Sequence, residues 1–125
     1  MHDITEGGLA TAVEELSVSG GYGIDVDVDS IPVFKETGTI CRLLGMDPLG
    51  LIGSGSLLIC CRESAWEELM GNIRRAGVNV ACIGRVDERG GGIQAVKKGE
   101  PFIWPRFTVD EITRLYSSGS HTSRE

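Results

Sequence analysis

The sequence predicts an α/β (α+β) sandwich, in which helices pack on a mixed β-sheet in the order α-β-α-β-α-β-β-α. Apolar residues recur at helical spacing at Leu9, Val13 and Leu16, and residues 24–29 alternate strictly between apolar and acidic side chains. Further strand-like runs are separated by amphipathic helical patterns, which is typical of sheets covered by helices. At 125 residues, one domain is expected, covering residues 1–116, followed by a polar, disordered tail over residues 117–125.

The first three elements are a helix, a strand and a second helix. The helix is expected over residues 8–19, because Gly20 and Gly21 follow its last apolar residue and glycine commonly ends helices. The strand covers residues 24–28, with its apolar residues inward and its aspartates on a solvated face. A cation bridging these aspartates is the alternative interpretation. The second helix covers residues 35–44, with Ile40, Leu43 and Leu44 as its apolar stripe.

The fourth and fifth elements are a buried strand and a helix. Residues 57–61 are apolar without alternation, which predicts a central strand covered on both faces, with Cys60 and Cys61 in the core. The helix is expected over residues 64–76, because Ser64 and Glu67 form a capping box.

Two strands and a short helix complete the fold. The strands, over residues 79–86 and 93–97, are joined through the glycines of residues 88–92, a pattern that predicts a hairpin. Thr108 and Glu111 form a second capping box, which predicts a helix over residues 108–116.

Composition argues against several classes of protein. The net charge of −6 disfavours binding to nucleic acid or to an anionic membrane surface. The apolar runs are too short to span a bilayer, and the polar, acidic start is unlike a signal peptide. The four cysteines contain no C-x-x-C pair, which indicates reduced, mostly buried thiols in a cytoplasmic protein.

The segment leading into the first helix is the strongest candidate site. Asp3, Thr5, Gly7 and Gly8 place an acid, a hydroxyl and free backbone N–H groups at a helix start, which favours a phosphate. Asp3 is the natural Mg²⁺ ligand there, because hard cations prefer carboxylate oxygen. Glu6 would oppose a bare phosphate unless a cation intervenes. The alternative is an ordinary helix cap that binds nothing.

A second glycine- and serine-rich loop comes just before the apolar strand. Ser54, Gly55 and Ser56 can line a ligand or form a flexible turn. Because a phosphate needs several convergent donors, we expect both loops to form one site. No catalytic residue and no metal site can be assigned from the sequence.

Several segments in their shared order resemble one known family. The segment at residues 2–9 is similar to the loop that opens the C-terminal domain in the aminoimidazole ribonucleotide (AIR) synthetase superfamily, which reads Asp-x-Thr/Ser-x-Gly-Gly-Leu. The segments at residues 44–49, 54–59 and 83–86 also match family motifs. The resemblance covers about residues 2–116.

The resemblance implies one half of a two-domain enzyme that uses ATP and Mg²⁺. In the family, an N-terminal domain supplies the ATP–Mg²⁺ ligands and the homodimer interface, and the C-terminal domain closes the cleft over a phosphorylated small molecule. This chain therefore resembles the C-terminal domain of an ATP-dependent synthetase or kinase, and alone it is expected to be inactive and to bind no cofactor tightly. Its Glu6, and its lack of the terminal cysteine of the hydrogenase factor, leave the substrate open. The alternatives are a stand-alone binding or regulatory module and a structural dimerisation domain.

Overall fold

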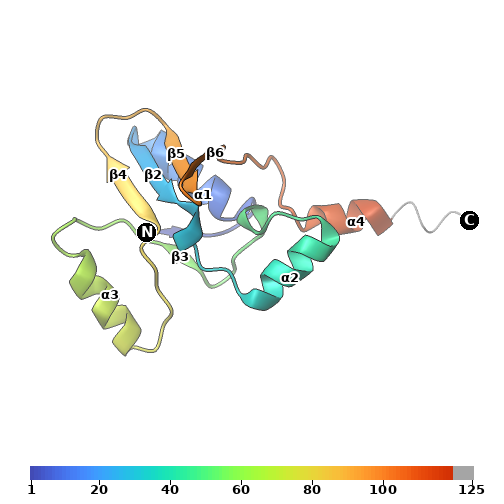
Figure 1. Ribbon diagram of the computed structural model, residues 1–125, viewed down its shortest axis with the longest axis horizontal. Coiled ribbons are helices and arrows are strands. Elements are labelled where there is room, and N and C mark those ends of the chain that lie inside the picture. The colour runs from blue at the N-terminus through green and yellow to red at the C-terminus, as the bar shows by residue number, and fades with distance from the viewer. Residues whose placement is uncertain (120–125) are drawn as a thin grey trace, which may run out of the picture.

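The computed structural model describes residues 1–119 and shows a two-layer body with further helices lying outside it (Figure 1). The strands are β1 (His2–Asp3), β2 (Gly23–Asp27), β3 (Leu57–Leu58), β4 (Gly84–Asp87), β5 (Ile93–Lys97) and β6 (Glu100–Phe102). The helices are α1 (Gly8–Gly20), α2 (Lys35–Leu44), α3 (Trp66–Arg75) and α4 (Thr113–Gly119), with short 3-10 helices η1 (Val28–Ser30) and η2 (Pro48–Gly50).

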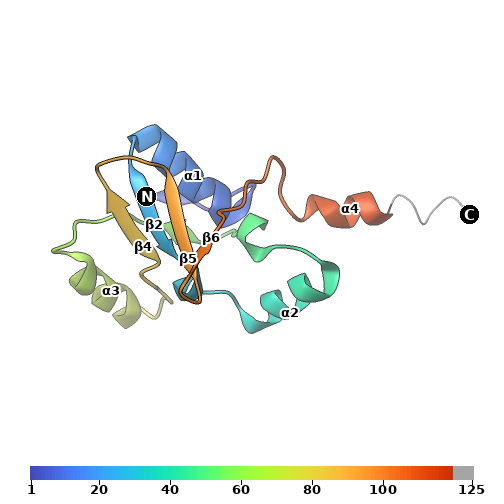
Figure 2. The ribbon, with the colours of Figure 1, turned by 45° about the horizontal axis from the view of Figure 1, so that its top comes forward.

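A four-stranded mixed sheet in the order β4-β2-β5-β6 forms the centre of the molecule. Strand β2 runs antiparallel to β4 and parallel to β5. Helix α1 covers one face of this sheet (Figure 2). The core between the two layers is made by Val13 of α1 with Ile24, Val26 and Ala95 of the strands. The predicted fold class is therefore confirmed, as are the inward positions of the apolar residues of α1 and β2.

The opposite face of the sheet is polar. Asp25, Arg85 and Gln94 are exposed there, as the alternation predicted for β2. Asp29 leaves this face, because the chain turns into η1, where Asp29 accepts a hydrogen bond from the Lys98 backbone at 2.7 Å.

The predicted hairpin between residues 79–86 and 93–97 is wrong. Strand β2 lies between β4 and β5, so residues 88–92 arch over the end of β2. Gly90, Gly91 and Gly92 all have positive φ, which gives the arch its curvature. The arch passes so close to β2 that a Cβ on Gly23 would lie 2.3 Å from the Gly90 carbonyl oxygen.

The prediction of a central buried strand at residues 57–61 is also wrong. Only Leu57 and Leu58 form a strand, β3, and they pair with β1 in a separate two-stranded sheet. Leu57 is 53% exposed, and Cys60 and Cys61 lie on the surface. An apolar run indicates that its side chains are buried against other parts of the protein, but no element within residues 1–119 packs on both faces of this run.

Only one of the four cysteines is buried. Cys41 lies inside the protein, and burial raises the pKa of its thiol, whereas Cys60, Cys61 and Cys82 are exposed. The expectation of mostly buried thiols is therefore wrong for this chain. Cys41 faces inward from α2 in place of the predicted stripe, whose Leu43 is 80% exposed.

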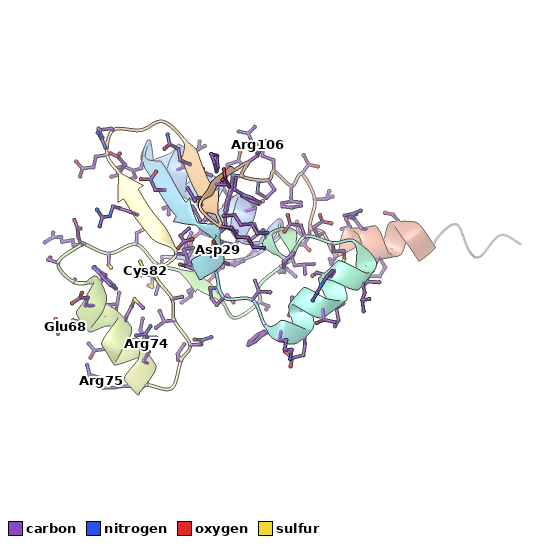
Figure 3. The ribbon with its side chains drawn as sticks, viewed as in Figure 1. Asp29, Glu68, Arg74, Arg75, Cys82 and Arg106 are labelled. Atoms are coloured by element: carbon purple, nitrogen blue, oxygen red, sulfur yellow. The ribbon has the colours of Figure 1, made fainter. Side chains whose placement is uncertain are left out.

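Helix α3 stands apart from the sheet (Figure 1). Its charged residues Glu68, Arg74 and Arg75 are exposed, and Cys82 lies on the connector that leads from α3 back to β4 (Figure 3). Trp66, at the start of this helix, remains 38% exposed. The predicted cap at Ser64 does not form, because the helix begins at Trp66 after Ala65 and has no side-chain cap.

The last helix differs from its predicted bounds. It begins at Thr113 rather than at residue 108, because Asp110, not Thr108, caps the turn that leads into the helix: its Oδ1 accepts from the Ile112 N–H at 3.0 Å. It continues to Gly119, into the segment predicted to be a disordered tail, and residues 120–125 lie outside the described part of the chain. Within the described residues, no helix is both long and apolar enough to cross a membrane.

Candidate functional site

Two consecutive glycines shape the start of α1. Gly7 has φ +82° and Gly8 has φ +65°, so both are in the left-handed region that favours glycine. Gly8 also packs directly on η2, since a Cβ there would lie 2.4 Å from the Leu49 carbonyl oxygen. These two glycines are therefore required by backbone conformation and by close packing, whatever binds nearby.

The structure brings the two predicted loops side by side. The Ile4 N–H donates to the Ser56 carbonyl at 3.3 Å, and the Gly53 N–H donates to the Ile4 carbonyl at 3.2 Å. Strands β1 and β3 continue this pairing, with Asp3 opposite Leu57. The segment before α1 and the serine–glycine loop thus form one backbone unit.

The seven candidate residues divide into an exposed group and a buried group. The exposed group consists of Asp3, Thr5, Ser54, Gly55 and Ser56. The buried group is Gly7 and Gly8, which lie under η2 and the segment that precedes α4. The exposed group offers three hydroxyls and backbone N–H groups, which can donate to phosphate oxygens, and one carboxylate, which can only accept or bind a cation.

Asp110, whose side chain contacts the start of α1, was not identified from the sequence. The Gly7 N–H donates to Oδ2 of Asp110 at 3.0 Å, across more than a hundred residues of chain. Asp110 is only 4% exposed. The only local signal was the ability of aspartate to cap the next turn, and nothing in the sequence links that turn to Gly7.

His2 lies beside this site and is bound on both ring nitrogens. Nδ1 is 2.6 Å from the Asp3 carbonyl oxygen, and Nε2 is 2.6 Å from Oε2 of Glu15 on α1. These two hydrogen bonds, the one to the Asp3 carbonyl first, raise the pKa of His2 above its usual value of 6.5. The protonated ring thus ties β1 to α1.

We expect Glu15→Gln to lower the free energy of unfolding at low pH only, because it removes the partner of the protonated His2 ring. Because the folded-state pKa of His2 is raised, its contribution is complete below about pH 6.5 and is lost as the pH rises through the folded-state value. For so exposed a pair the effect is about 0.2–1 kcal/mol. Urea unfolding from pH 5 to pH 9 should show the deficit of Glu15→Gln shrinking as the pH rises.

The control for this pH series is the neighbouring carboxylate. Glu14 pairs with Arg106 at 3.2 Å and does not touch His2. Glu14→Gln should give the same deficit at every pH in this range. If the loss of stability in Glu15→Gln is likewise the same at every pH, the interaction of His2 with Glu15 does not depend on protonation of His2.

Two hollows in the surface lie away from these loops. One groove of about 680 Å³ lies between α1 and the β5–β6 edge, where Arg106 is found (Figure 3). A smaller one of about 300 Å³ lies beside the glycine arch, between Gly23 and Arg89. In residues 1–119, no three His, Cys, Asp or Glu side chains are grouped so that they could hold a metal ion.

Comparison with known proteins gives a consistent family match. Residues 1–97 match the family described as AIR synthase related protein, C-terminal domain. The carbamoyl dehydratase HypE of Cupriavidus necator is 36% identical over 92 residues, which are 72% of this chain and 26% of that protein.

Solved structures show the same fold. The crystal structure of Escherichia coli HypE has a TM-score of 0.79 at 27% identity, covering 91% of this chain and 36% of that chain. The structure of the hydrogenase maturation protein HypE in complex with ATP has a TM-score of 0.77 at 25% identity, covering 85% of this chain and 35% of that chain. The chain therefore spans about a third of these structures and about a quarter of the curated relative.

Proposed function

This chain belongs to the AIR synthase related family, since most of it matches the C-terminal domain of that family. We propose that it is the cleft-closing domain of an ATP-dependent synthetase or kinase. The observation that carries the proposal is the joined pair of loops, in which exposed Thr5, Ser54 and Ser56 lie on two segments that pair with each other at Ile4, just before α1. In this proposal the hydroxyls and N–H groups of the exposed group contact the phosphates of a nucleotide or of a phosphorylated small molecule, and Asp3 meets them through Mg²⁺.

The residues present suit phosphate better than they suit a metal ion. Hydroxyls and backbone N–H groups of the two loops are suitable donors to phosphate oxygens. Asp3 is a single exposed carboxylate, and the described residues hold no cluster of metal ligands around it. Mg²⁺ would therefore need further ligands from an N-terminal ATP-binding domain, and the Mg²⁺–ATP complex would neutralise phosphate charge only with both domains in place.

Exposed apolar surface supports an intramolecular partner of this kind. Leu57 and Ile59 follow the serine–glycine loop, and Trp66 begins α3 close by in the sequence, all with substantial exposure. An apolar strand run and an uncovered helix stripe indicate surfaces that a further part of a longer protein covers. We propose that this part is the N-terminal domain, that the full-length protein is a cytoplasmic homodimer, and that the substrate is a phosphorylated small molecule.

We expect the purified 125-residue chain to hydrolyse no ATP. The electrostatic stabilisation of phosphoryl transfer requires the metal site and phosphate contacts of both domains. Phosphate release from Mg²⁺–ATP should be at background for the chain alone and should appear for a longer protein that includes an upstream domain with paired aspartates. Turnover by the chain alone that Asp3→Ala abolishes would contradict the proposal.

A stand-alone binding or regulatory module is the second candidate. The joined loops favour it equally, because recognition of a phosphorylated metabolite needs the same donors. The discriminating observation is whether the reading frame continues upstream of Met1 into a nucleotide-binding domain. If it does not, and the chain alone binds a phosphorylated metabolite without turnover, the module is the better assignment.

A further inference from the structure

The carboxylate of Asp110 is hydrogen-bonded to the backbone at the start of α1. Its Oδ2 accepts from the Gly7 N–H at 3.0 Å, and its Oδ1 accepts from the Ile112 N–H at the same distance. Both oxygens are therefore used, and the side chain is buried. Gly7 brings no side chain of its own to cap the helix.

We propose that Asp110 is a positioning residue, whose carboxylate is an anion supplied by the chain itself and holds the Gly7–Gly8 turn in place. A ligand therefore binds to the exposed loop residues and not to Gly7. A negative charge at the start of a helix is stabilised by the backbone N–H groups and the helix dipole there. The anion-binding capacity that the sequence indicates at Gly7 is thus already used within the chain. The assignment of Thr5 and Ser54–Ser56 to the ligand rests on the proposed function, but the assignment of Asp110 does not.

The segment around Asp110 is fixed by bonds of its own. The Glu111 N–H donates to the Gly50 carbonyl at 3.0 Å, and the Glu111 carboxylate pairs with Arg114 at 3.2 Å. Arg114 also donates to the Gly45 carbonyl at 2.8 Å. The carboxylate of Asp110 is therefore presented to Gly7 by a segment that is bound to η2 and to the end of α2.

This segment lies beyond residues 1–97, the part of the chain that matches the family. Asp110, which lies after the matched residues, thus stabilises the Gly7–Gly8 turn, which lies among them. A truncation at residue 97 would remove the anion from Gly7 while leaving every matched residue in place.

Amide exchange in the chain and in Asp110→Ala tests the contact directly. Loss of a hydrogen bond to a charged group should speed exchange at the Gly7 amide at least about tenfold relative to a reference amide in β2. Added formate should restore the protection, because a small carboxylate can occupy the vacated position. Unchanged exchange at Gly7, or no recovery with formate, would overturn the proposal.

Two further variants keep the exchange test decisive. If Asp110→Ala does not fold, Asp110→Asn replaces it: an amide has one acceptor oxygen for two N–H donors, so Gly7 protection should still fall. Asp27→Ala is the matched control, because Asp27 accepts from Asp29 N–H in the same type of turn, away from Gly7. Equal loss of Gly7 protection in Asp27→Ala would show a general effect on stability and would contradict the proposal.

Titration of the unaltered chain with inorganic phosphate separates this inference from the proposed function. We expect backbone amide shifts at Thr5 and Ser54–Ser56 and none at Gly7. A shift at Gly7 as large as theirs would mean that phosphate displaces Asp110, against the inference. If no amide shifts, phosphate binding by the chain alone fails, while the exchange and formate results still decide the role of Asp110.

Discussion

Gly8→Ala is expected to lower the free energy of unfolding by about 2–5 kcal/mol. The left-handed conformation of Gly8, at φ +65°, costs a side-chain-bearing residue about 1–2 kcal/mol. The added Cβ would also lie 2.4 Å from the Leu49 carbonyl oxygen and 2.6 Å from that of Leu51. Because these are backbone atoms, relief requires α1 and η2 to separate, which adds about 1–3 kcal/mol. Urea unfolding followed by circular dichroism measures the change.

Gly45→Ala is the matched control for this substitution. Gly45 has the same φ of +65°, and a Cβ there would meet nothing within 4 Å. It should therefore lose only the conformational part, about 1–2 kcal/mol. Equal losses in the two variants would show that the close approach of α1 to η2 contributes nothing.

Val13→Ala is expected to lower the free energy of unfolding by about 2–3 kcal/mol. Val13 is 2% exposed and packs against Ile24, Val26 and Ala95 between α1 and the sheet. The loss combines about 0.8 kcal/mol of transfer free energy for each methyl group removed with the cost of the cavity left behind. Thermal or urea unfolding of the variant measures it.

The same substitution on the outer side of α1 provides the control. Val18 is 75% exposed, so Val18→Ala should change stability by no more than about 0.5 kcal/mol. A loss in Val18→Ala similar to that of Val13→Ala would contradict the assignment of the core to the α1–sheet contact.

The parts of the fold that the sequence predicted are those whose pattern is satisfied within the chain. The apolar residues of α1 and the alternation in β2 face each other, so local periodicity was sufficient. The run at residues 57–61 and the stripe of α2 gave equally clear apolar patterns but remain exposed in the described structure. Periodicity shows which face needs a cover, but it does not show which part of a protein supplies the cover.

The glycines illustrate a second limit. The run Gly90–Gly92 predicted a turn, and a turn is present, but the strand that it crosses comes from residues 23–27. Turn chemistry fixes the local curvature, whereas the pairing partner depends on the long-range sheet order. The contact of Asp110 with Gly7 escaped prediction for the same reason.

The sheet order also constrains how this chain folds during synthesis. Strand β2 pairs on one side with β4 and on the other with β5, so Ile24 meets Ile93 and Val86 across its two edges. Residues 28–83 must be synthesised before either partner exists, which at ribosomal rates takes on the order of seconds. During that interval α1 and β2 can pack on each other, but both edges of β2 still lack their partner strands. Sheet closure then requires a large loop to form before strand pairing compensates for its entropy, so we expect the central sheet to form late and slowly during folding.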